Sequence, residues 1–466
     1  MAESRTFTGL LAATAVGVYL LVIAGATAAI TDAVAACSSW PLCQGPVTLA
    51  EPDLLIARGH RLTAAVVGVL GLATVALGLR TATRRRVKAA LVVAIALYPV
   101  QIALGAFVAT SGAAPVLPGA HLAVGMAIFV SFVLALAWHL EFETGDENET
   151  PVDDLSPAPI PDEDETDSPT PVAALSTKQR VLGTVGAYFR LMKPRLMWLL
   201  CLVAAAGMAL AAGPDLTTRT VLLTLGGGVL AIGSSGTFNH VLERDIDRRM
   251  DRTSDRPIAT HRIPVANAMA FGVALAAAAL VLFWQVNVLA AALGLTAILF
   301  YSVIYTLVLK PNTVQNTVIG GAAGALPALI GWVAVEGSLG LPGIALAGVI
   351  FLWTPAHFYN LALAYKDDYE AGGFPMMPVV RGETETRKHI VYYLGATLVG
   401  SGVLAAMTSL GWLYALTSAS VGAVFLWAVI RLHREQTEGA AFRAFHASNA
   451  YLGLLLVAIV VDSLAL

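Results

Sequence analysis

The sequence predicts an all-α integral membrane protein with about thirteen transmembrane helices, four in a first bundle and nine in a second. The 466 residues are 57% hydrophobic and only 13% charged, with a mean hydropathy of +0.74. Apolar runs of about 20 residues, long enough to cross the hydrocarbon core of a bilayer, recur along most of the chain. The alternating pattern of a transmembrane β-barrel is absent, so helices are the structure that satisfies the backbone in lipid.

The candidate spans fall into two groups along the chain. The first span, 8–30, follows Arg5 and precedes small residues, as in a signal peptide. Its apolar core is longer than that of a signal peptide, so we interpret it as a retained helix. Three more spans, at 59–80, 88–109 and 117–139, complete the first group. The second group has nine, at 195–212, 219–240, 264–284, 286–309, 314–335, 341–363, 389–409, 411–431 and 444–464.

The charge distribution predicts the orientation of these spans. Residues 141–168 hold 12 of the 31 acidic residues and no Lys or Arg, which leaves 28 basic against 19 acidic residues elsewhere. The basic excess falls in the loops 80–88, 244–262, 366–388 and 431–443. With thirteen spans and a cytoplasmic N-terminus, all four loops face the cytoplasm, as the positive-inside rule requires. We therefore expect a multi-pass protein of the cell membrane.

Residues 141–180 separate the two groups of spans. They are acidic and rich in Pro, Ser and Thr, and they contain almost no aromatic residues. Such a segment cannot bury enough apolar surface to fold. It predicts a disordered cytoplasmic linker, without a binding role, between a domain at 1–140 and a domain at 181–466.

The stretch NHVLERDIDRRMDRTSDR at 239–256 predicts a metal and diphosphate site. Asn239, Glu243 and Asp247 recur every four residues, so a continuing helix carries them on one face. An amide and two carboxylates are the hard oxygen ligands that Mg²⁺ prefers. The surrounding arginines, among them Arg252 and Arg256, fit a site that also receives a strongly anionic group such as a diphosphate. The alternative is a charged loop that only sets topology.

A second acidic segment, AYKDDYEAGGFPMMPVVRGETETRK, occupies 364–388. Its Asp367 and Asp368 stand at the cytoplasmic end of a span. Two carboxylate clusters at one membrane face suit a diphosphate held through Mg²⁺. The chemistry implied is ionisation of an allylic diphosphate, in which cations take up the charge of the departing pyrophosphate and the apolar interior shields a carbocation from water. The candidate diphosphate-binding residues are Lys193, Arg195, Arg252, Arg256, Lys310 and Lys366.

Residues from about 186 to 466 resemble the protohaem IX farnesyltransferases (haem O synthases) of the UbiA-type intramembrane prenyltransferases. The motifs are YFRLMKPR at 188–195, the 239–257 stretch, QNTVIGGAAGALPALIGW at 315–332 and TPAHFYNLALAYKDDYEAGGFPMMPVV at 354–380. The last two distinguish this branch from quinone prenyltransferases.

The resemblance assigns roles to the acidic residues. It implies that Asn239, Glu243 and Asp247 hold Mg²⁺ and the diphosphate, with Asp367 and Asp368 opposite and Asp368 also on the metal. Glu243 stands where the family usually has Asp. The superfamily's second motif usually places carboxylates four residues apart, and Ala364 stands four before Asp368.

The resemblance also implies a reaction. Farnesyl diphosphate alkylates a vinyl group of haem b, and water completes the hydroxyethylfarnesyl group of haem O. His357 lies about three helical turns deeper than Asp367. It either contacts haem, through the iron or a propionate, or is a buried, hydrogen-bonded histidine. The alternative functions are a prenyltransferase for a quinone or lipid acceptor, and a transporter or non-catalytic haem-binding protein. No nucleic-acid partner is indicated.

The first domain carries a different set of residues. Cys37 and Cys43 flank SSWPL in a loop expected outside, where a disulfide is favoured. His60 and His121, near the outer ends of spans two and four, form either an axial pair for bound haem or two interfacial histidines.

The motifs CSSWPLCQG and GHR, with the second histidine, resemble one half of haem A synthase. Four of that family's eight spans are present, so a haem A synthase or a second copy of the chain is a candidate partner. Ala57 replaces the family's glutamate. This substitution argues against oxidation of haem O by this domain.

Overall fold

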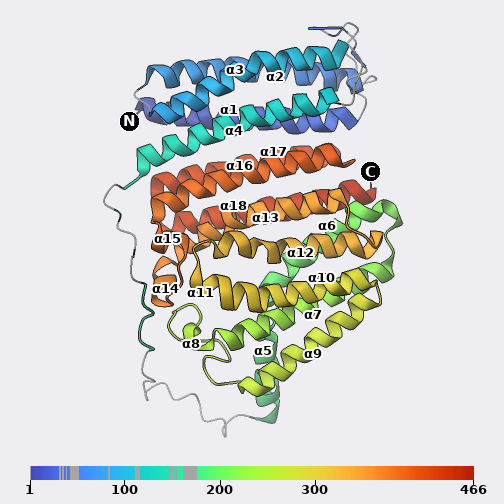
Figure 1. Cartoon of the computed structure of the whole chain (residues 1–466), viewed down its shortest axis with the longest axis vertical. Coiled ribbons are helices and arrows are strands. Elements are labelled where there is room, and N and C mark those ends of the chain that lie inside the picture. The colour runs from blue at the N-terminus through green and yellow to red at the C-terminus, as the bar shows by residue number, and fades with distance from the viewer. Residues whose placement is uncertain are drawn as a thin grey trace. The chain divides into compact units, whose positions relative to one another are not determined.

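The computed structural model describes residues 2–30, 52–81, 84–110, 116–146, 155–160 and 176–465, with isolated positions in the first loop and the linker (Figure 1). Within these residues every regular element is helical. Thirteen helices are long and apolar enough to cross a membrane, and they coincide with the predicted spans. The predicted fold class, an all-α integral membrane protein, is therefore confirmed.

The chain forms two compact units. The first comprises residues 1–149, 355–361 and 384–466, and the second comprises 150–354 and 362–383. The helices of the first unit are α1 (Ala2–Ile30), α2 (Pro52–Arg80), α3 (Arg85–Thr110), α4 (Val116–Thr144), α16 (Glu383–Met407), α17 (Trp412–Glu435) and α18 (Glu438–Ala465).

Buried polar contacts join the N-terminal helices to α16 and α17 within the first unit. The hydroxyls of Tyr19 and Ser418 lie 2.6 Å apart, and both side chains are fully buried. Trp138 Nε1 donates to the hydroxyl of Tyr392 at 2.6 Å. Helices α1 and α4 therefore pack on α16 and α17, so the compact units do not follow the boundary near residue 140 that composition suggests.

The second unit holds the remaining helices. The longer ones are α5 (Thr177–Leu191), α6 (Pro194–Ala212), α7 (Thr218–Leu242), α9 (Val265–Trp284), α10 (Val288–Leu299), the π-helix η3 (Phe300–Leu309), α12 (Asn316–Glu336) and α13 (Leu341–Ala364), of which 355–361 belong to the first unit. The shorter ones are η2 (Gly213–Asp215), α8 (Arg244–Asp247), α11 (Lys310–Asn312), α14 (Lys366–Ala371) and α15 (Met377–Val380).

Local sequence explains where these helices begin and how they pack. Pro194 opens α6, where its missing N–H costs no hydrogen bond. The Asn287 side chain caps α10 by accepting the N–H of Ala290 at 2.7 Å. Helices α6 and α12 approach closely because Gly331 has no side chain, since a Cβ there would lie 2.1 Å from the carbonyl oxygen of Ala204.

The linker differs from the free spacer that its composition predicts. At one end, α4 continues to Thr144, and at the other, Ser176 and Gln179 form a capping box that starts α5. Between them, the N–H of Val152 donates to the carbonyl of Val379 at 3.1 Å. The N–H of Ala158 donates to Ala371 at 2.9 Å. These two backbone hydrogen bonds connect Val152 and Ala158 to residues 371–379 within the second unit.

Candidate active site

Asn239, Glu243 and Asp247 share one face, as their spacing predicts. The helix α7 ends at Leu242, and Glu243 leaves helical geometry with φ −96° and ψ 4°. The N–H of Glu243 still bonds to the carbonyl of Asn239 at 2.9 Å, and that of Asp247 to Glu243 at 2.8 Å. These bonds preserve the four-residue repeat through α8, and all three side chains are at least 97% buried.

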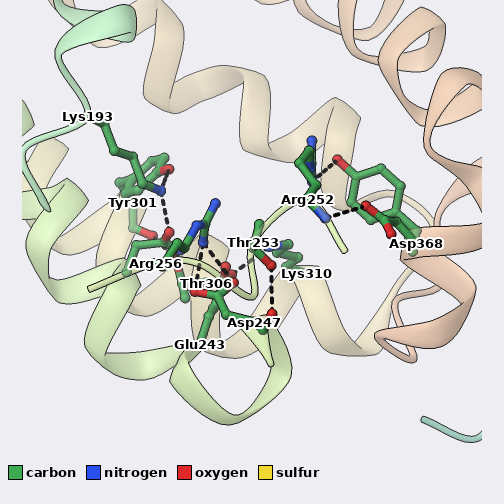
Figure 2. Close-up of polar contacts among 12 residues, drawn as sticks. Lys193, Glu243, Asp247, Arg252, Thr253, Arg256, Tyr301, Thr306, Lys310 and Asp368 are labelled. Carbon is green, nitrogen blue, oxygen red and sulfur yellow. Dashed lines mark hydrogen bonds and ion pairs between the residues drawn. The ribbon is translucent and has the colours of Figure 1, made fainter. Parts of the chain in front are cut away.

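Each of these three side chains is paired with one of the predicted cations, and Figure 2 labels the three cations and the two carboxylates. Lys310 Nζ lies 2.7 Å from Glu243 Oε1. Arg256 Nη1 donates to both carboxylate oxygens of Asp247, at 2.7 and 2.8 Å. Lys193 Nζ donates to Asn239 Oδ1. The structure thus gathers residues separated by more than 100 positions into one polar cluster.

The electrostatics of this cluster follow from its burial. Removal from water lowers the pKa of Lys193 to about 7, and the nearby Arg256 contributes in the same direction. Burial raises the pKa of Glu243, but Lys310 and Lys193 outweigh it and the net shift is downward. Burial raises the pKa of Asp247, and Arg256 offsets part of that rise.

The formal charge of the cluster favours an anion. Lys193, Arg256 and Lys310 supply three cationic side chains when protonated, whereas Glu243 and Asp247 supply two carboxylates. A buried site with such a surplus is stabilised by a further anionic group. A diphosphate fits this requirement.

Asp368 occupies a different position from the other acidic residues. Its carboxylate accepts the backbone N–H of Asp251 at 3.1 Å and that of Arg252 at 3.3 Å, so it caps the loop that follows α8. Asp367 is exposed, and Lys366 pairs with Glu383 at 3.2 Å.

The described part of the chain shows no group of three or more His, Cys, Asp or Glu side chains in metal-binding proximity. Arg195 is exposed. The structure thus brings together the first carboxylate motif and three of the six predicted cations. Asp368 and Arg252 join this group through the loop after α8, whereas Asp367, Lys366 and Arg195 lie outside it.

Several aromatic side chains complete the site and were not predicted. The guanidinium of Arg252 lies over the rings of Tyr365 and Tyr369, at 4.5 and 5.2 Å from their centroids. Lys310 Nζ lies 4.1 Å from the centroid of Phe374. Such cation–π contacts hold a cation in place without neutralising it. Their only signal in the sequence is the concentration of aromatic residues around the KDDY segment.

The π-helix η3 supplies two further contacts. Tyr301 accepts a hydrogen bond from Lys193 Nζ at 3.3 Å, and Thr306 accepts one from Asn239 Nδ2 at 3.2 Å. The Thr306 hydroxyl also donates to the carbonyl of Tyr301, five residues earlier, at 2.9 Å. π-Helical turns are rare and occur often at functional sites, but apolar periodicity gives no sign of this one.

An apolar pocket adjoins the polar cluster. Its cavity volume is about 90 Å³, and Lys193 and Tyr301 contribute to its lining. The rest of the wall is largely apolar and comes from α6, α7, α9, α10 and α12. An anionic head held at the cluster and an apolar chain laid in the pocket would therefore meet suitable surroundings. The pocket-lining residues include Leu200, Ala204, Leu225, Ile232, Phe283 and Ile330.

His357 is buried in the first unit. Its Nδ1 lies 2.7 Å from the hydroxyl of Ser448 on α18, and its ring stacks on Phe445 with centroids 4.4 Å apart. These contacts are those of a hydrogen-bonded histidine inside a membrane bundle, and they leave a role toward haem as a proposal.

His60 and His121 lie in the N-terminal helices α2 and α4. Each ring has a buried Nδ1 without a hydrogen-bond partner. Gly25 faces the first ring and Gly105 the second, because a Cβ at these positions would lie 3.2 and 3.0 Å from the respective Cε1 atoms. In the loop that precedes α2, a disulfide joins Cys37 to Cys43.

Comparison with known proteins assigns the second half of the chain to a protein family. The sequence pattern of the UbiA prenyltransferase family matches residues 199–454. The chain belongs to this family. The match includes α7, the Asp368 segment and the polar cluster apart from Lys193.

Relatives within the UbiA family specify the branch. A protoheme IX farnesyltransferase of Haloarcula marismortui is 76% identical over 466 residues, which is the full length of both chains. Protoheme IX farnesyltransferase 1 of Natronomonas pharaonis is 66% identical and covers 98% of this chain and 99% of its own. This chain is therefore a prenyltransferase of the protoheme IX farnesyltransferase branch.

Two further comparisons concern length and fold. Protoheme IX farnesyltransferase 1 of Saccharopolyspora erythraea is 43% identical over 295 residues, which are 62% of this chain but 94% of that protein. A solved structure described as digeranylgeranylglyceryl phosphate synthase is 17% identical, with a TM-score of 0.52, and covers 60% of this chain and 99% of its own. The likeness shows that the two proteins share the UbiA-type helical fold.

Proposed function

We propose that this enzyme transfers the farnesyl group of farnesyl diphosphate to a vinyl group of haem b and thereby makes haem O. The observation that carries the proposal is the polar cluster of Lys193, Asn239, Glu243, Asp247 and their partners beside an apolar pocket. The names of relatives that match the whole chain support haem b as the acceptor.

The cluster suits the diphosphate head. Lys193, Arg256 and Lys310 each form charge-assisted hydrogen bonds that phosphate oxygens can replace. Asn239, Glu243 and Asp247 offer the hard oxygen atoms that Mg²⁺ requires, so this donor set fits the metal. Bound Mg²⁺ would neutralise charge on the pyrophosphate that departs.

We assign Asp368 and Arg252 to the same head group. Asp368 fixes the loop that carries Arg252, and Tyr365 and Tyr369 hold the guanidinium. Arg252 is thereby kept as a cation available to a phosphate oxygen. Asp368 acts in this proposal through the loop that it caps.

The reaction begins at C1 of the farnesyl group. The bond from C1 to the diphosphate oxygen breaks, and the oxygen keeps the electron pair. The terminal vinyl carbon of haem b then forms a bond to C1, which leaves a cation on the vinyl carbon attached to the porphyrin. Water adds there and loses a proton, giving the hydroxyethylfarnesyl group. The apolar pocket protects the farnesyl cation from water until the carbon–carbon bond has formed.

We propose that His357 orients haem b, either through the iron or through a propionate. Support comes from its burial next to Phe445 and from its place in the TPAHF segment. In a His60→Ala/His121→Ala background, His357→Gln should retain pyrophosphate binding but lose haem b binding, measured by the Soret absorbance of the purified protein. Unchanged haem binding would leave His357 with only its hydrogen bond to Ser448.

The central test is the haem extracted from membranes that express the full-length chain, supplied with haem b, farnesyl diphosphate and Mg²⁺. The full chain is required because α16–α18 share a compact unit with α1–α4. Wild-type protein should form haem O, whereas Asp247→Asn should not. An active, folded wild type that leaves haem b unchanged but prenylates a quinone or lipid would replace haem b as the acceptor.

We propose a second function for the N-terminal helices, which is to bind a haem through His60 and His121. The buried, unpartnered nitrogens and the two facing glycines support such a site. Purified full-length protein should show a low-spin haem spectrum, and a His60→Ala/His121→Ala variant should lose it. Unchanged haem content in that variant would exclude the axial pair.

The orientation and the partners are also proposals. We propose a cell-membrane location with the N-terminus in the cytoplasm, so that the Lys- and Arg-rich loops face inward. An impermeant thiol reagent should then label a Ser4→Cys variant only in inverted vesicles. The four N-terminal spans resemble half of a haem A synthase, so we propose a second copy of the chain or a separate haem A synthase as partner, which cross-linking in membranes would identify.

A further inference from the structure

Part of the acidic linker packs against the segment that carries Asp368. We call Val152 and residues 155–160 the strap. The N–H groups of Val152 and Ala158 donate to the carbonyls of Val379 and Ala371, at 3.1 and 2.9 Å. The two anchoring residues lie six positions apart in the strap, and their acceptors lie eight positions apart.

The side chains of the strap add to an apolar cluster. Val152 and Leu155 pack against buried residues that include Met250, Tyr369 and Phe374. Met250 comes from the loop after the first carboxylate motif, whereas Tyr369 and Phe374 come from the second segment. The strap thus contributes to an apolar cluster that joins the two segments.

Gly373 accommodates the strap. Its φ of +69° lies in the left-handed region that favours glycine. A Cβ at this position would also lie 2.8 Å from Pro157 Cγ. Both the backbone conformation and the close approach of the strap therefore require glycine here.

The cluster supports the cations of the polar site. Phe374 packs beneath Lys310, whose Nζ is 4.1 Å from the ring centroid, and Lys310 pairs with Glu243. Tyr369 lies beneath Arg252 and accepts a hydrogen bond from its Nη2 at 3.3 Å. A continuous set of contacts therefore runs from Leu155 through two aromatic rings to two cations.

We infer that the strap is a positioning element for diphosphate binding, an inference that rests on the proposed function. It holds Tyr369 and Phe374 so that Arg252 and Lys310 are oriented toward the head group before the substrate arrives. Because these cations contact the diphosphate in both the ground state and the transition state, loss of the strap should raise KM and leave kcat nearly unchanged.

The test compares variants of the full-length protein by calorimetric titration with inorganic pyrophosphate and Mg²⁺. Leu155→Ser removes a half-buried side chain from the cluster without adding charge. Ala158→Pro removes the N–H that bonds to Ala371. Ile160→Ser is the matched control, because Ile160 is an exposed aliphatic residue of the same strap and lies outside the cluster.

We expect Leu155→Ser and Ala158→Pro to weaken pyrophosphate binding about fivefold, which corresponds to about 1 kcal/mol, and to raise the KM for farnesyl diphosphate to the same extent. Ile160→Ser should bind pyrophosphate as tightly as the wild type does. Leu155→Met keeps a large apolar side chain in the cluster and should also bind as tightly as the wild type.

Equal pyrophosphate binding by all variants would overturn the role of the strap and leave the proposed function intact. A wild type that binds pyrophosphate but makes no haem O would overturn the assignment of haem b as the acceptor, and the comparison of the strap variants would stay valid. A wild type that does not bind pyrophosphate would overturn both.

Discussion

Asp368 accepts the backbone N–H of Arg252 at 3.3 Å, although the two residues lie 116 positions apart. The contact joins the second acidic segment to the loop that follows the first. It explains how both segments can contribute to the proposed diphosphate site although Asp368 lies outside the polar cluster. The carboxylate of Asp368 therefore fixes the loop that carries the guanidinium of Arg252.

The role of Asp368 can be separated from that of a metal ligand. Asp368→Asn keeps one oxygen acceptor for the loop, so we expect kcat/KM to fall by about tenfold, the usual effect of weakening a hydrogen bond to a charged acceptor. The apparent affinity for Mg²⁺ should stay within about twofold of wild type. Kinetics at varied Mg²⁺ concentration provide the measurement. A large loss of Mg²⁺ affinity, equal to that of Asp247→Asn, would instead make Asp368 a direct ligand.

The buried pair of Glu243 and Lys310 should show strong coupling. Lys310→Met leaves the Glu243 carboxylate buried without its partner, which should cost about 3–5 kcal/mol of unfolding free energy. The double variant Glu243→Gln/Lys310→Met should recover most of this stability, because no uncompensated charge remains. Thermal unfolding in detergent measures both. The double variant should nevertheless stay inactive, since it lacks one candidate ligand and one cation, and its activity would contradict the assigned site.

The features that were predictable from the sequence are those with a short period or a long apolar run. The thirteen spans could be predicted because each is an apolar run long enough to cross the hydrocarbon core of a bilayer. The shared face of Asn239, Glu243 and Asp247 follows from a four-residue repeat, which survives the break at Glu243 because the backbone bonds on either side are helical.

Other features depend on contacts that no local pattern specifies. The pairing of Glu243 with Lys310 joins the residue after α7 to the first residue of α11, and these meet only when α7 packs near the end of η3. The strap has no period and its prolines resemble those of a free linker, so its contacts with residues 371–379 cannot be predicted from the sequence. The burial of Tyr19 against Ser418 likewise could not be predicted, because it joins segments that composition assigns to different domains.

The contact of α6 with α12 depends on the absence of a side chain at Gly331. A Gly331→Ala variant would place Cβ 2.1 Å from the carbonyl oxygen of Ala204, so one helix must shift. We expect a loss of about 1–3 kcal/mol of unfolding free energy, as for other overpacked cores. Gly348→Ala is the control, because a Cβ there meets nothing within 4 Å in a helix of similar length. Thermal unfolding should separate the two variants, and equal stability would show that the α6–α12 contact adjusts without cost.

The packing of the N-terminal helices on the prenyltransferase can be measured through Tyr19 and Ser418. Their hydroxyls lie 2.6 Å apart in a fully buried environment, so Tyr19→Phe and Ser418→Ala should each lower the unfolding free energy by about 1 kcal/mol. The double variant should cost less than the sum of the single variants, because each single change leaves one hydroxyl without its partner. Additive losses in this cycle would mean that α1 and α17 do not pack in solution as one unit. A coupling of the expected sign would show that the prenyltransferase and its N-terminal helices fold together, and truncation near residue 140 should then destabilise α16–α18 as well.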